Sequence, residues 1–290
     1  MGFQLAKNYA ALLDEVYKVA SVTADLTGDQ SMMRAGANAN EICYPQIDVS
    51  GLGDYDRNSG YTTGAVDLKW TTAKFNYDRG TKITVDVMDN EETFNLAFGK
   101  AGAELIRTKV APEADAFTFA TLAEVEGISI ADAVDFADAE AGDFLKALIV
   151  AKNTMDELEV PEEGRILYAT PTLLNGVMAL DTTKSREILN SFTLKKKVPQ
   201  SRFYTAIDLL SGKDDEAAGH YKKSASGCDI NFMIVHKPAI IKFDKHVANN
   251  VIAPENNPDS DGYILKYRKY GLVDAYKNKA AGIYLCHKGA

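Results

Sequence analysis

The sequence has 290 residues, of which 46% are hydrophobic and 25% are charged. This composition is ordinary for a globular protein with one large domain or two medium ones, and it excludes disordered, collagen-like and coiled-coil chains. The formal net charge of -9 argues against free nucleic acid as a general ligand, because such binding depends on Lys and Arg side chains that displace counterions. No apolar run approaches the roughly 18 residues that span a bilayer, and the N-terminus lacks the layout of a signal peptide. We therefore expect a cytosolic product with no membrane partner.

The first 44 residues are predicted to form an arm. Residues 3–20 carry apolar side chains at helical spacing, which predicts a short amphipathic helix that needs another surface to lie on. Residues 21–44 are small and polar with little periodicity, so we expect an arm here rather than a segment of the core. Such an arm has too little apolar surface to offset its ordering entropy, and contacts with other parts of the chain or other subunits must fix it.

Residues 47–87 change to the alternation that is typical of strands. Val66, Leu68 and Trp70 alternate with polar residues, and the same pattern returns at Ile83 and Val85. The stretch GLGDYDRNSGYTTG, which precedes them, is rich in turn formers. We interpret this region as a long two-stranded excursion with a glycine-rich tip, which is marginal in water without a partner. An ordinary sheet within a single domain is the alternative.

Residues 89–124 predict one unusually long helix. Apolar residues recur at three-and-four spacing, among them Phe94, Leu105 and Phe117, so one stripe is expected to be buried with a solvated face opposite it. Acidic residues crowd the start, where free amides and the helix dipole favour negative charge. Pro112 deletes one hydrogen bond and crowds the preceding turn. We expect either a kink or a break near residues 109–111.

From residue 141 onward, helices and strands alternate, which indicates an α/β layer. The predicted order is a helix over 141–158, a buried strand over 165–170, and a helix opening at Pro171, where proline is best tolerated. Residues 182–199, with the lysine triplet Lys195, Lys196 and Lys197, predict a solvated or interfacial loop, and 211–227 a surface loop. Residues 203–210 fit a strand or a helix. Later strands are predicted over residues 230–235, 263–276 and 281–286, with a turn at 253–262.

No motif for catalysis, cofactor binding or metal binding stands out. The four histidines, His220, His236, His246 and His287, lack the spacing of a metal pair. The three cysteines, Cys43, Cys228 and Cys286, are scattered singly, so buried free thiols are expected. There is no nucleophile elbow and no phosphate-binding loop, and NNPDSDG lacks the spacing and closing glutamate of a calcium loop. We therefore predict no catalytic, cofactor-binding or metal-binding residues, no cofactor, and a protein that is not an enzyme.

The order and spacing of these segments resemble the major capsid proteins of tailed phages, which have the Hong Kong 97-type fold, over nearly the whole chain. The most specific local similarities are DRGTKITVDVMDNEETF, VAPEADAFTFATLA and LKALIVAKNTMDELEVPEEGRILYATPTLLNGVM, followed by FDKHV and YGLVDAYKNKAAGIYL. The resemblance implies an α+β fold with an N-arm, an extended E-loop hairpin, a long spine-helix P-domain and an α/β A-domain. The implied divisions are residues 1–44 for the N-arm, 45–88 for the E-loop, 89–138 for the spine helix, 139–235 for the A-domain and 236–290 for the late P-domain strands and the return to the A-domain.

The resemblance implies a subunit that self-assembles, through pentamers and hexamers, into an icosahedral shell around the double-stranded DNA genome of a tailed bacteriophage or prophage. An encapsulin-like nanocompartment and, less favoured, an α/β enzyme are the alternatives. The implied partners are a portal, packaged DNA that is enclosed without sequence-specific binding, and a separate scaffolding protein or none, since no long charged helical region precedes the arm. The implied location is the virion capsid, assembled in the host cytoplasm. Lys69 and Lys74 lie in the E-loop region, but no partner asparagine or catalytic glutamate is identified, so no crosslink is predicted.

Overall fold

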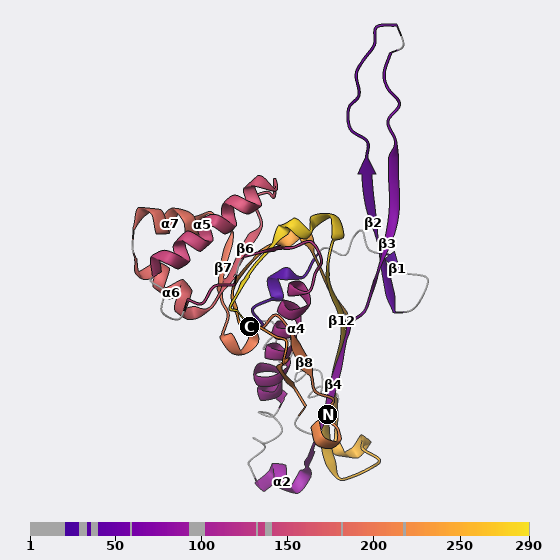
Figure 1. Ribbon diagram of the computed structural model, residues 1–290. Coiled ribbons are helices and arrows are strands. Elements are labelled where there is room, and N and C mark those ends of the chain that lie inside the picture. Colours follow the sequence, from indigo (N-terminus) through magenta and orange to yellow (C-terminus); the bar gives the residue numbers. More distant parts are fainter. Residues whose placement is uncertain are drawn as a thin grey trace. The chain divides into compact units, whose positions relative to one another are not determined.

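The computed structural model describes residues 21–28, 34–35, 40–58, 60–92, 102–131, 133–136, 141–180, 182–216 and 219–289 (Figure 1). The predicted helix over residues 3–20 lies outside these ranges. The chain divides into two compact units. The hairpin unit is Asp29–Asn76, and the body consists of Met1–Gly28 together with Tyr77–Ala290.

The hairpin unit is a three-stranded sheet in the order β1-β2-β3, with β1 at Arg34–Ala35, β2 at Glu41–Val49 and β3 at Val66–Lys74. β2 and β3 are antiparallel, with Glu41 opposite Lys74 and Val49 opposite Val66. The predicted excursion over residues 47–87 is therefore partly wrong. Its last strand, β4 at Tyr77–Asp86, belongs to the body and pairs with β12 instead of returning along the hairpin.

The body contains a five-stranded sheet in the order β5-β13-β10-β6-β7. Its strands are β5 at Ser129–Ile130, β6 at Arg165–Ala169, β7 at Leu194–Lys197, β10 at Ile230–His236 and β13 at Ile283–His287. The central strands β13, β10 and β6 are antiparallel, while β5 and β7 each add to an edge in parallel. Every residue of β6 and β10 is buried, which explains why both read as continuous apolar runs in the sequence.

Helices cover both faces of this sheet. On one face lie α5 at Ala141–Glu157, α6 at Pro171–Ala179 and α7 at Thr183–Asn190, whose apolar side chains pack with Leu167, Phe232 and Tyr284. The other face packs against α4, Ala111–Ala123, through Phe119 and Leu122 (Figure 1). The predicted helices at 141–158 and from Pro171, and the predicted strands at 165–170 and 230–235, are confirmed within a residue or two.

A second sheet of the body has the order β11-β12-β4 and is antiparallel throughout. β11 is Ile240–Ile252 and β12 is Gly262–Ala275, and a turn that includes the short helix η6, Pro254–Asn256, joins them. The strand predicted over 263–276 and the turn predicted over 253–262 are thus confirmed. A bulge interrupts the pairing between Asp244 and His246, and a Cβ added to Gly271 opposite it would lie 2.9 Å from the Phe243 carbonyl oxygen, so this close approach requires glycine.

The region of the predicted long helix contains α2 at Val87–Glu92, the π-helical turn η2 at Ile106–Val110 and α4. Residues 93–101 lie outside the described ranges, so a single helix over 89–124 stays a prediction. Residues 102–123 are helical without a break. In the π turn, the Ala111 N–H bonds to the Ile106 carbonyl, five residues back. This wider turn relieves the crowding between the Pro112 ring and the preceding turn, and turns of this kind are a known cause of helix bends.

The solvated face predicted for this helix is absent from α4. Ten of its thirteen residues are buried, including Glu113, Asp115 and Thr118. The helix lies between the five-stranded sheet and the β11-β12-β4 sheet, with Phe119 and Leu122 on one side and the preceding turn packed on Leu265 and Tyr267 of β12 on the other. The acidic residues of α4 are therefore inside the protein.

Three loop or arm predictions are wrong in part. Residues 182–199 contain α7 and β7, because Thr182 and Ser185 form a reciprocal capping box that starts the helix. Residues 211–227 contain the short helix η4 at Asp214–Glu216 and β9 at Tyr221–Lys223, which pairs with β8 at Ile207–Leu209. Residues 21–28 include η1 at Ala24–Leu26, and Leu26 is part of the core. The remaining short helices are η3 at Gln200–Arg202, η5 at Lys237–Ala239 and η7 at Lys277–Gly282.

Candidate functional site

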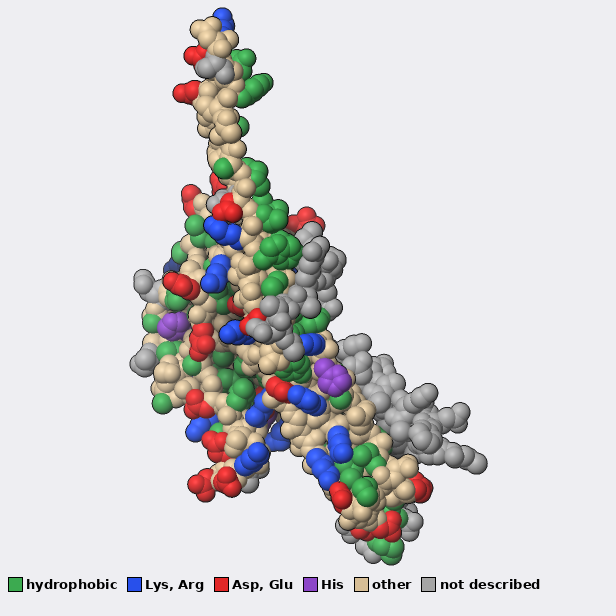
Figure 2. All heavy atoms as spheres, turned by 90° about the vertical axis from the view of Figure 1, so that its right-hand side faces the viewer, with side chains coloured by type: hydrophobic (Ala, Val, Ile, Leu, Met, Phe, Trp, Pro, Cys, Tyr) green, Lys and Arg blue, Asp and Glu red, His purple; other side chains and the backbone are tan. Residues whose placement is uncertain are grey.

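The hairpin has one apolar face that is open to solvent. Directly opposed residues of antiparallel strands share a face, and the opposed pairs Pro45 with Trp70, Ile47 with Leu68, and Val49 with Val66 form a ladder of apolar side chains. Ile47 is 61% exposed and Leu68 is 53% exposed. Figure 2 shows apolar side chains along the hairpin. An exposed apolar ladder of this length is typical of a surface that another protein covers.

The other face of the hairpin is polar towards the tip, whereas at its base Ile42, Tyr44 and Ala73 lie on that face and are buried. The Lys69 ammonium lies 2.7 Å from an Asp67 carboxylate oxygen, and the Thr71 hydroxyl donates to Gln46 at 3.3 Å. In the half of the hairpin nearer the tip, one face is therefore apolar and the other polar, as expected for a ribbon that lies on a partner with one side and faces water with the other.

The hairpin tip has structure of its own. Asp56 and Gly60 exchange two backbone hydrogen bonds, at 3.1 and 2.7 Å. Gly60 has a φ of +81°, which glycine adopts at little cost. The rings of Tyr55 and Tyr61 lie 4.8 Å apart, and both are exposed. The tip therefore presents aromatic side chains on a small turn closed by hydrogen bonds.

In the body, the fully buried Asp115 of α4 holds the segment at residues 21–23. Its carboxylate accepts hydrogen bonds from the Ser21 hydroxyl (2.7 Å), the Val22 amide (3.1 Å), and both the amide and hydroxyl of Thr23 (3.1 and 2.7 Å). Arg202 adds an ion pair at 3.1 Å. A buried carboxylate costs several kcal/mol unless it is paired and hydrogen-bonded, and here both conditions are met.

Lys242 of β11 reaches the same segment from the other side. Its buried ammonium donates to the Thr23 carbonyl at 2.9 Å and to the Thr23 hydroxyl at 2.6 Å. Burial, followed by the charge of nearby Lys269, lowers the pKa of Lys242 to about 8. Residues 21–26, predicted to be an arm outside the core, are in fact fastened by a buried polar network.

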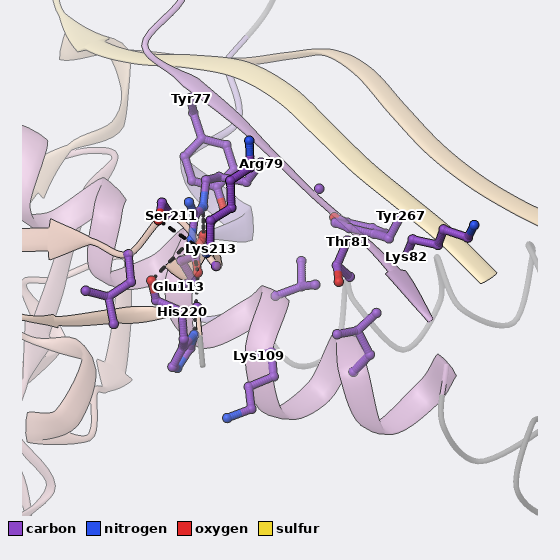
Figure 3. A pocket seen from close by; sticks show the side chains of 16 residues that line it. Tyr77, Arg79, Thr81, Lys82, Lys109, Glu113, Ser211, Lys213, His220 and Tyr267 are labelled. Atoms are coloured by element: carbon purple, nitrogen blue, oxygen red, sulfur yellow. Dashed lines mark hydrogen bonds and ion pairs between the residues drawn. The ribbon is translucent and has the colours of Figure 1, made fainter. Parts of the chain in front are cut away.

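A second polar group joins three elements of the body around Glu113 of α4 (Figure 3). Arg79 of β4 donates to the Glu113 carboxylate at 2.6 and 3.3 Å, and the Tyr77 hydroxyl donates at 3.2 Å. A ring nitrogen of His220, which precedes β9, lies 3.5 Å from the same carboxylate. Burial alone would raise the pKa of Glu113, but hydrogen bonds from His220 and Arg79 outweigh it and lower that pKa. The group ties β4, α4 and the β8–β9 hairpin together.

The four histidines lie in separate parts of the fold. His220 contacts Glu113, His236 ends β10, His246 lies exposed on β11 and His287 ends β13. Among the described residues, no group of three or more His, Cys, Asp or Glu side chains could hold a metal ion. His246 is a strand residue, as the sequence predicts.

All three cysteines are free. Cys286 is buried, and burial raises its pKa to about 11, which leaves the thiol unreactive. Cys43 and Cys228 are only partly buried, so the expectation of buried thiols holds for one of three. Lys69 pairs with Asp67, and the Lys74 ammonium lies 4.0 Å from Glu41. In the part of the chain that the structure describes, no helix is long and apolar enough to cross a membrane.

Sequence reasoning missed the roles of Asp115 and Glu113. Both interrupt the apolar run of α4, and a carboxylate at such a position signals a buried ion pair or hydrogen-bond network when the surrounding residues are core residues. The residues that satisfy them, Thr23, Arg79 and Arg202, are distant in the sequence and carry no local pattern.

No protein-family model and no curated protein sequence matches the chain. Solved structures do resemble it. A chain of the mature capsid of bacteriophage PhiM1 is 13% identical, with a TM-score of 0.57 over 86% of this chain and 82% of that chain. A chain of Mycobacterium phage Che8 is 12% identical, with a TM-score of 0.59 over 92% and 90%. A chain of a virus-like particle from Pyrococcus furiosus is also 12% identical, with a TM-score of 0.59 over 97% and 99%. The chain therefore has the mixed helix and sheet fold that is found in phage capsids and in this virus-like particle.

Proposed function

We propose that the protein is the major capsid protein of a tailed bacteriophage or prophage, and that it self-assembles into an icosahedral shell around double-stranded DNA. The likeness to phage capsid chains over most of the chain carries this proposal. The role is structural rather than catalytic. The partners are other copies in pentamers and hexamers, a portal, the enclosed DNA, and a scaffolding protein where one is used. Assembly takes place in the host cytoplasm, and the final location is the virion capsid.

The exposed apolar ladder of the hairpin supports a role in assembly. A two-stranded ribbon with little core of its own gains stability when its apolar face is covered, and neighbouring copies of the same chain supply such a surface in a closed shell. The net charge of -9 suits a wall that encloses DNA without adhering to it.

In this proposal the fold is of the Hong Kong 97 type. Residues 1–44 are the N-arm, 45–88 the E-loop, 89–138 the spine helix, 139–235 the A-domain, and 236–290 the late P-domain strands and return to the A-domain. The structural likeness to phage capsid chains over most of the chain supports this assignment.

An encapsulin-like nanocompartment is the second candidate, favoured by the likeness to the virus-like particle over almost the full length of both chains. The contents of purified particles distinguish the two functions. DNA that resists nuclease until the shell is opened supports the capsid, whereas an enzyme enclosed without DNA supports the nanocompartment.

The first test is assembly of the full-length chain, expressed with and without the neighbouring genes of its locus. Sedimentation velocity and negative-stain microscopy should reveal closed particles of uniform diameter. A protein that stays monomeric under both conditions contradicts the proposal.

A matched pair of variants tests the role of the hairpin. Ile47→Ser with Leu68→Ser removes one opposed pair of the apolar face and should lower the assembled fraction by about tenfold or more, since hot-spot pairs carry most of an interface's energy. Gln46→Ser with Lys69→Ser removes the opposed pair next to it on the polar face. This control should assemble normally. Equal effects of the two variants would contradict a specific role for the apolar face.

A further inference from the structure

The Glu113 group lines a hollow of about 440 Å³ in the body (Figure 3). Its walls come from β4, from the helix at residues 105–113, and from the loop between β8 and β9. Among the described residues that line it, one is a carboxylate, the already paired Glu113, and four are cationic: Arg79, Lys82, Lys109 and Lys213. The lining thus has an excess of positive charge on a chain whose net charge is -9, while the acidic residues Asp214, Asp215 and Glu216 follow Lys213 on the same loop outside the lining.

Three of these cations are available to a ligand. Arg79 is held by Glu113 and by the His220 carbonyl, whereas Lys82, Lys109 and Lys213 form no ion pair with any described residue. All three are exposed. Figure 3 shows Lys109 on the helix, Lys213 on the loop and Lys82 farther along β4, so the three lysines are spread around the hollow rather than gathered at one point. Such a spread matches a peptide with several carboxylates better than it matches a single small anion.

The same chain carries a segment of complementary charge in the turn between β11 and β12. Glu255, Asp259 and Asp261 are exposed there, and no Lys or Arg lies within residues 246–265. The Asn257 side chain fixes the turn by donating to Ser260 at 3.0 Å and to the Gly262 carbonyl at 2.8 Å, while it accepts from the Asp259 amide at 3.1 Å. The turn thus presents its carboxylates on a fixed backbone, which lowers the entropy cost of binding.

The acidic turn cannot reach the hollow of its own subunit. Lys82, the lining residue nearest the turn along the sheet, pairs with Lys266 of β12, and Asp261 lies five residues from Lys266 along an extended strand, which is about 17 Å. That distance exceeds the Debye length of about 8 Å at physiological salt. Any direct pairing of these charges must join two copies of the chain.

We propose that the cationic hollow receives the acidic β11–β12 turn of a second copy. The inference rests on the proposed function, since it names one contact of the self-assembly. Pairing preformed surfaces of opposite charge sets the register between subunits and speeds their encounter. A DNA duplex is the less favourable occupant, because its bulk does not fit a concave site of this volume and a carboxylate, Glu113, is part of the lining.

Charge exchange between the two surfaces tests this contact. Lys82→Glu with Lys109→Glu reverses the hollow, and Asp259→Lys with Asp261→Lys reverses the turn; all four positions are exposed, so the fold should persist, as circular dichroism can verify. Each variant alone should lower the assembled fraction by about tenfold through like-charge repulsion. The two reversals combined in one chain should restore assembly. The loss and the rescue are measured by sedimentation at low and physiological salt.

The matched control is Lys184→Glu with Lys237→Glu, which makes the same change in charge at two exposed lysines that do not line the hollow. Combined with the reversed turn, this control should not rescue assembly. Normal assembly of the reversed hollow, or failure of the combined reversal to rescue, overturns the proposal. Normal assembly with loss of bound DNA overturns it in favour of a phosphate ligand. If the unaltered chain never assembles, the proposed function itself has failed.

Discussion

The hairpin and the five-stranded sheet are both built from apolar strands, but they satisfy those residues in opposite ways. In the sheet, β6 and β10 are wholly buried between α4 on one face and α5, α6 and α7 on the other. In the hairpin, the apolar ladder faces solvent on the isolated subunit; it consists of the cross-strand pairs Pro45 with Trp70, Ile47 with Leu68, and Val49 with Val66. The sheet thus completes its core within one chain, whereas the apolar face of the hairpin gains its stabilisation only when a partner covers it.

The same leucine-to-alanine substitution in both regions tests this difference between the sheet and the hairpin. Leu167→Ala in β6 removes a fully buried side chain and should lower the free energy of unfolding by about 2–5 kcal/mol, because it leaves a cavity. Leu68→Ala in β3 should change it by less than about 0.5 kcal/mol. Urea unfolding of unassembled subunits, followed by circular dichroism, measures both.

The single tryptophan, Trp70, lies in the hairpin. Its fluorescence therefore follows the hairpin separately from the body. A loss for Leu68→Ala as large as for Leu167→Ala would mean that the hairpin is part of the cooperative core of the isolated subunit.

The next largest effect is expected at Asp115, where residues 21–23 join the body through polar contacts. Asp115→Asn keeps the size of the side chain but turns one acceptor into a donor that faces the Ser21, Thr23 and Arg202 donors. We expect a loss of about 3 kcal/mol, the cost of breaking a buried charged network, together with faster proteolysis near residue 21. Asp208→Asn is the control, since Asp208 forms only a surface pair with Lys222 at 3.9 Å; its loss should be below about 1 kcal/mol. Equal losses would contradict the role of Asp115.

Elements with local sequence signals could be predicted, whereas contacts between residues distant in the sequence could not. The sequence predicts five elements nearly to the residue: α5, α6, β6, β10 and β12. Their signals are local, namely the periodicity of apolar residues, Pro171 at the start of α6, and the acidic turn before β12. The sequence does not predict α7, because the helix starts with a Thr182–Ser185 capping box that lacks the usual glutamate. It does not predict β7 either, because a run of lysines is typical of a loop, although lysines are also common on strands at the edge of a sheet. The burial of Glu113 and Asp115 depends on partners distant in the sequence, so no local pattern could have revealed it.

A smaller effect should appear in the pH dependence of stability. The pKa of Lys242 is lowered from 10.5 to about 8 in the fold, so the unfolded chain holds its proton to higher pH than the folded chain does. Stability therefore rises as pH increases from below 8 towards 10.5. We expect Lys242 alone to add about 1 kcal/mol between about pH 7 and about pH 9.

Lys242→Met provides the comparison, because it removes the titrating group. The free energy of unfolding is measured for the unaltered protein and for this variant at both pH values, and the difference between the two proteins gives the contribution of Lys242. This difference removes the effect of other groups such as Cys286, whose raised pKa lowers stability as pH rises above 9. A difference that does not change with pH would show that Lys242 keeps its ordinary pKa in the fold.

The smallest effect on stability is expected at Pro112. Pro112→Ala restores an amide that can bond to the carbonyl of residue 108, so the π turn at Ile106–Val110 is no longer required. The gain of this bond opposes the loss of proline's restriction of the unfolded chain, about 0.4–1 kcal/mol, and the net change should be below about 1 kcal/mol. Hydrogen exchange should show a newly protected amide at position 112. Pro171→Ala, at the first position of α6, should gain no protected amide because that N–H has no partner within the helix; equal protection at both positions would mean that the π turn does not depend on the proline.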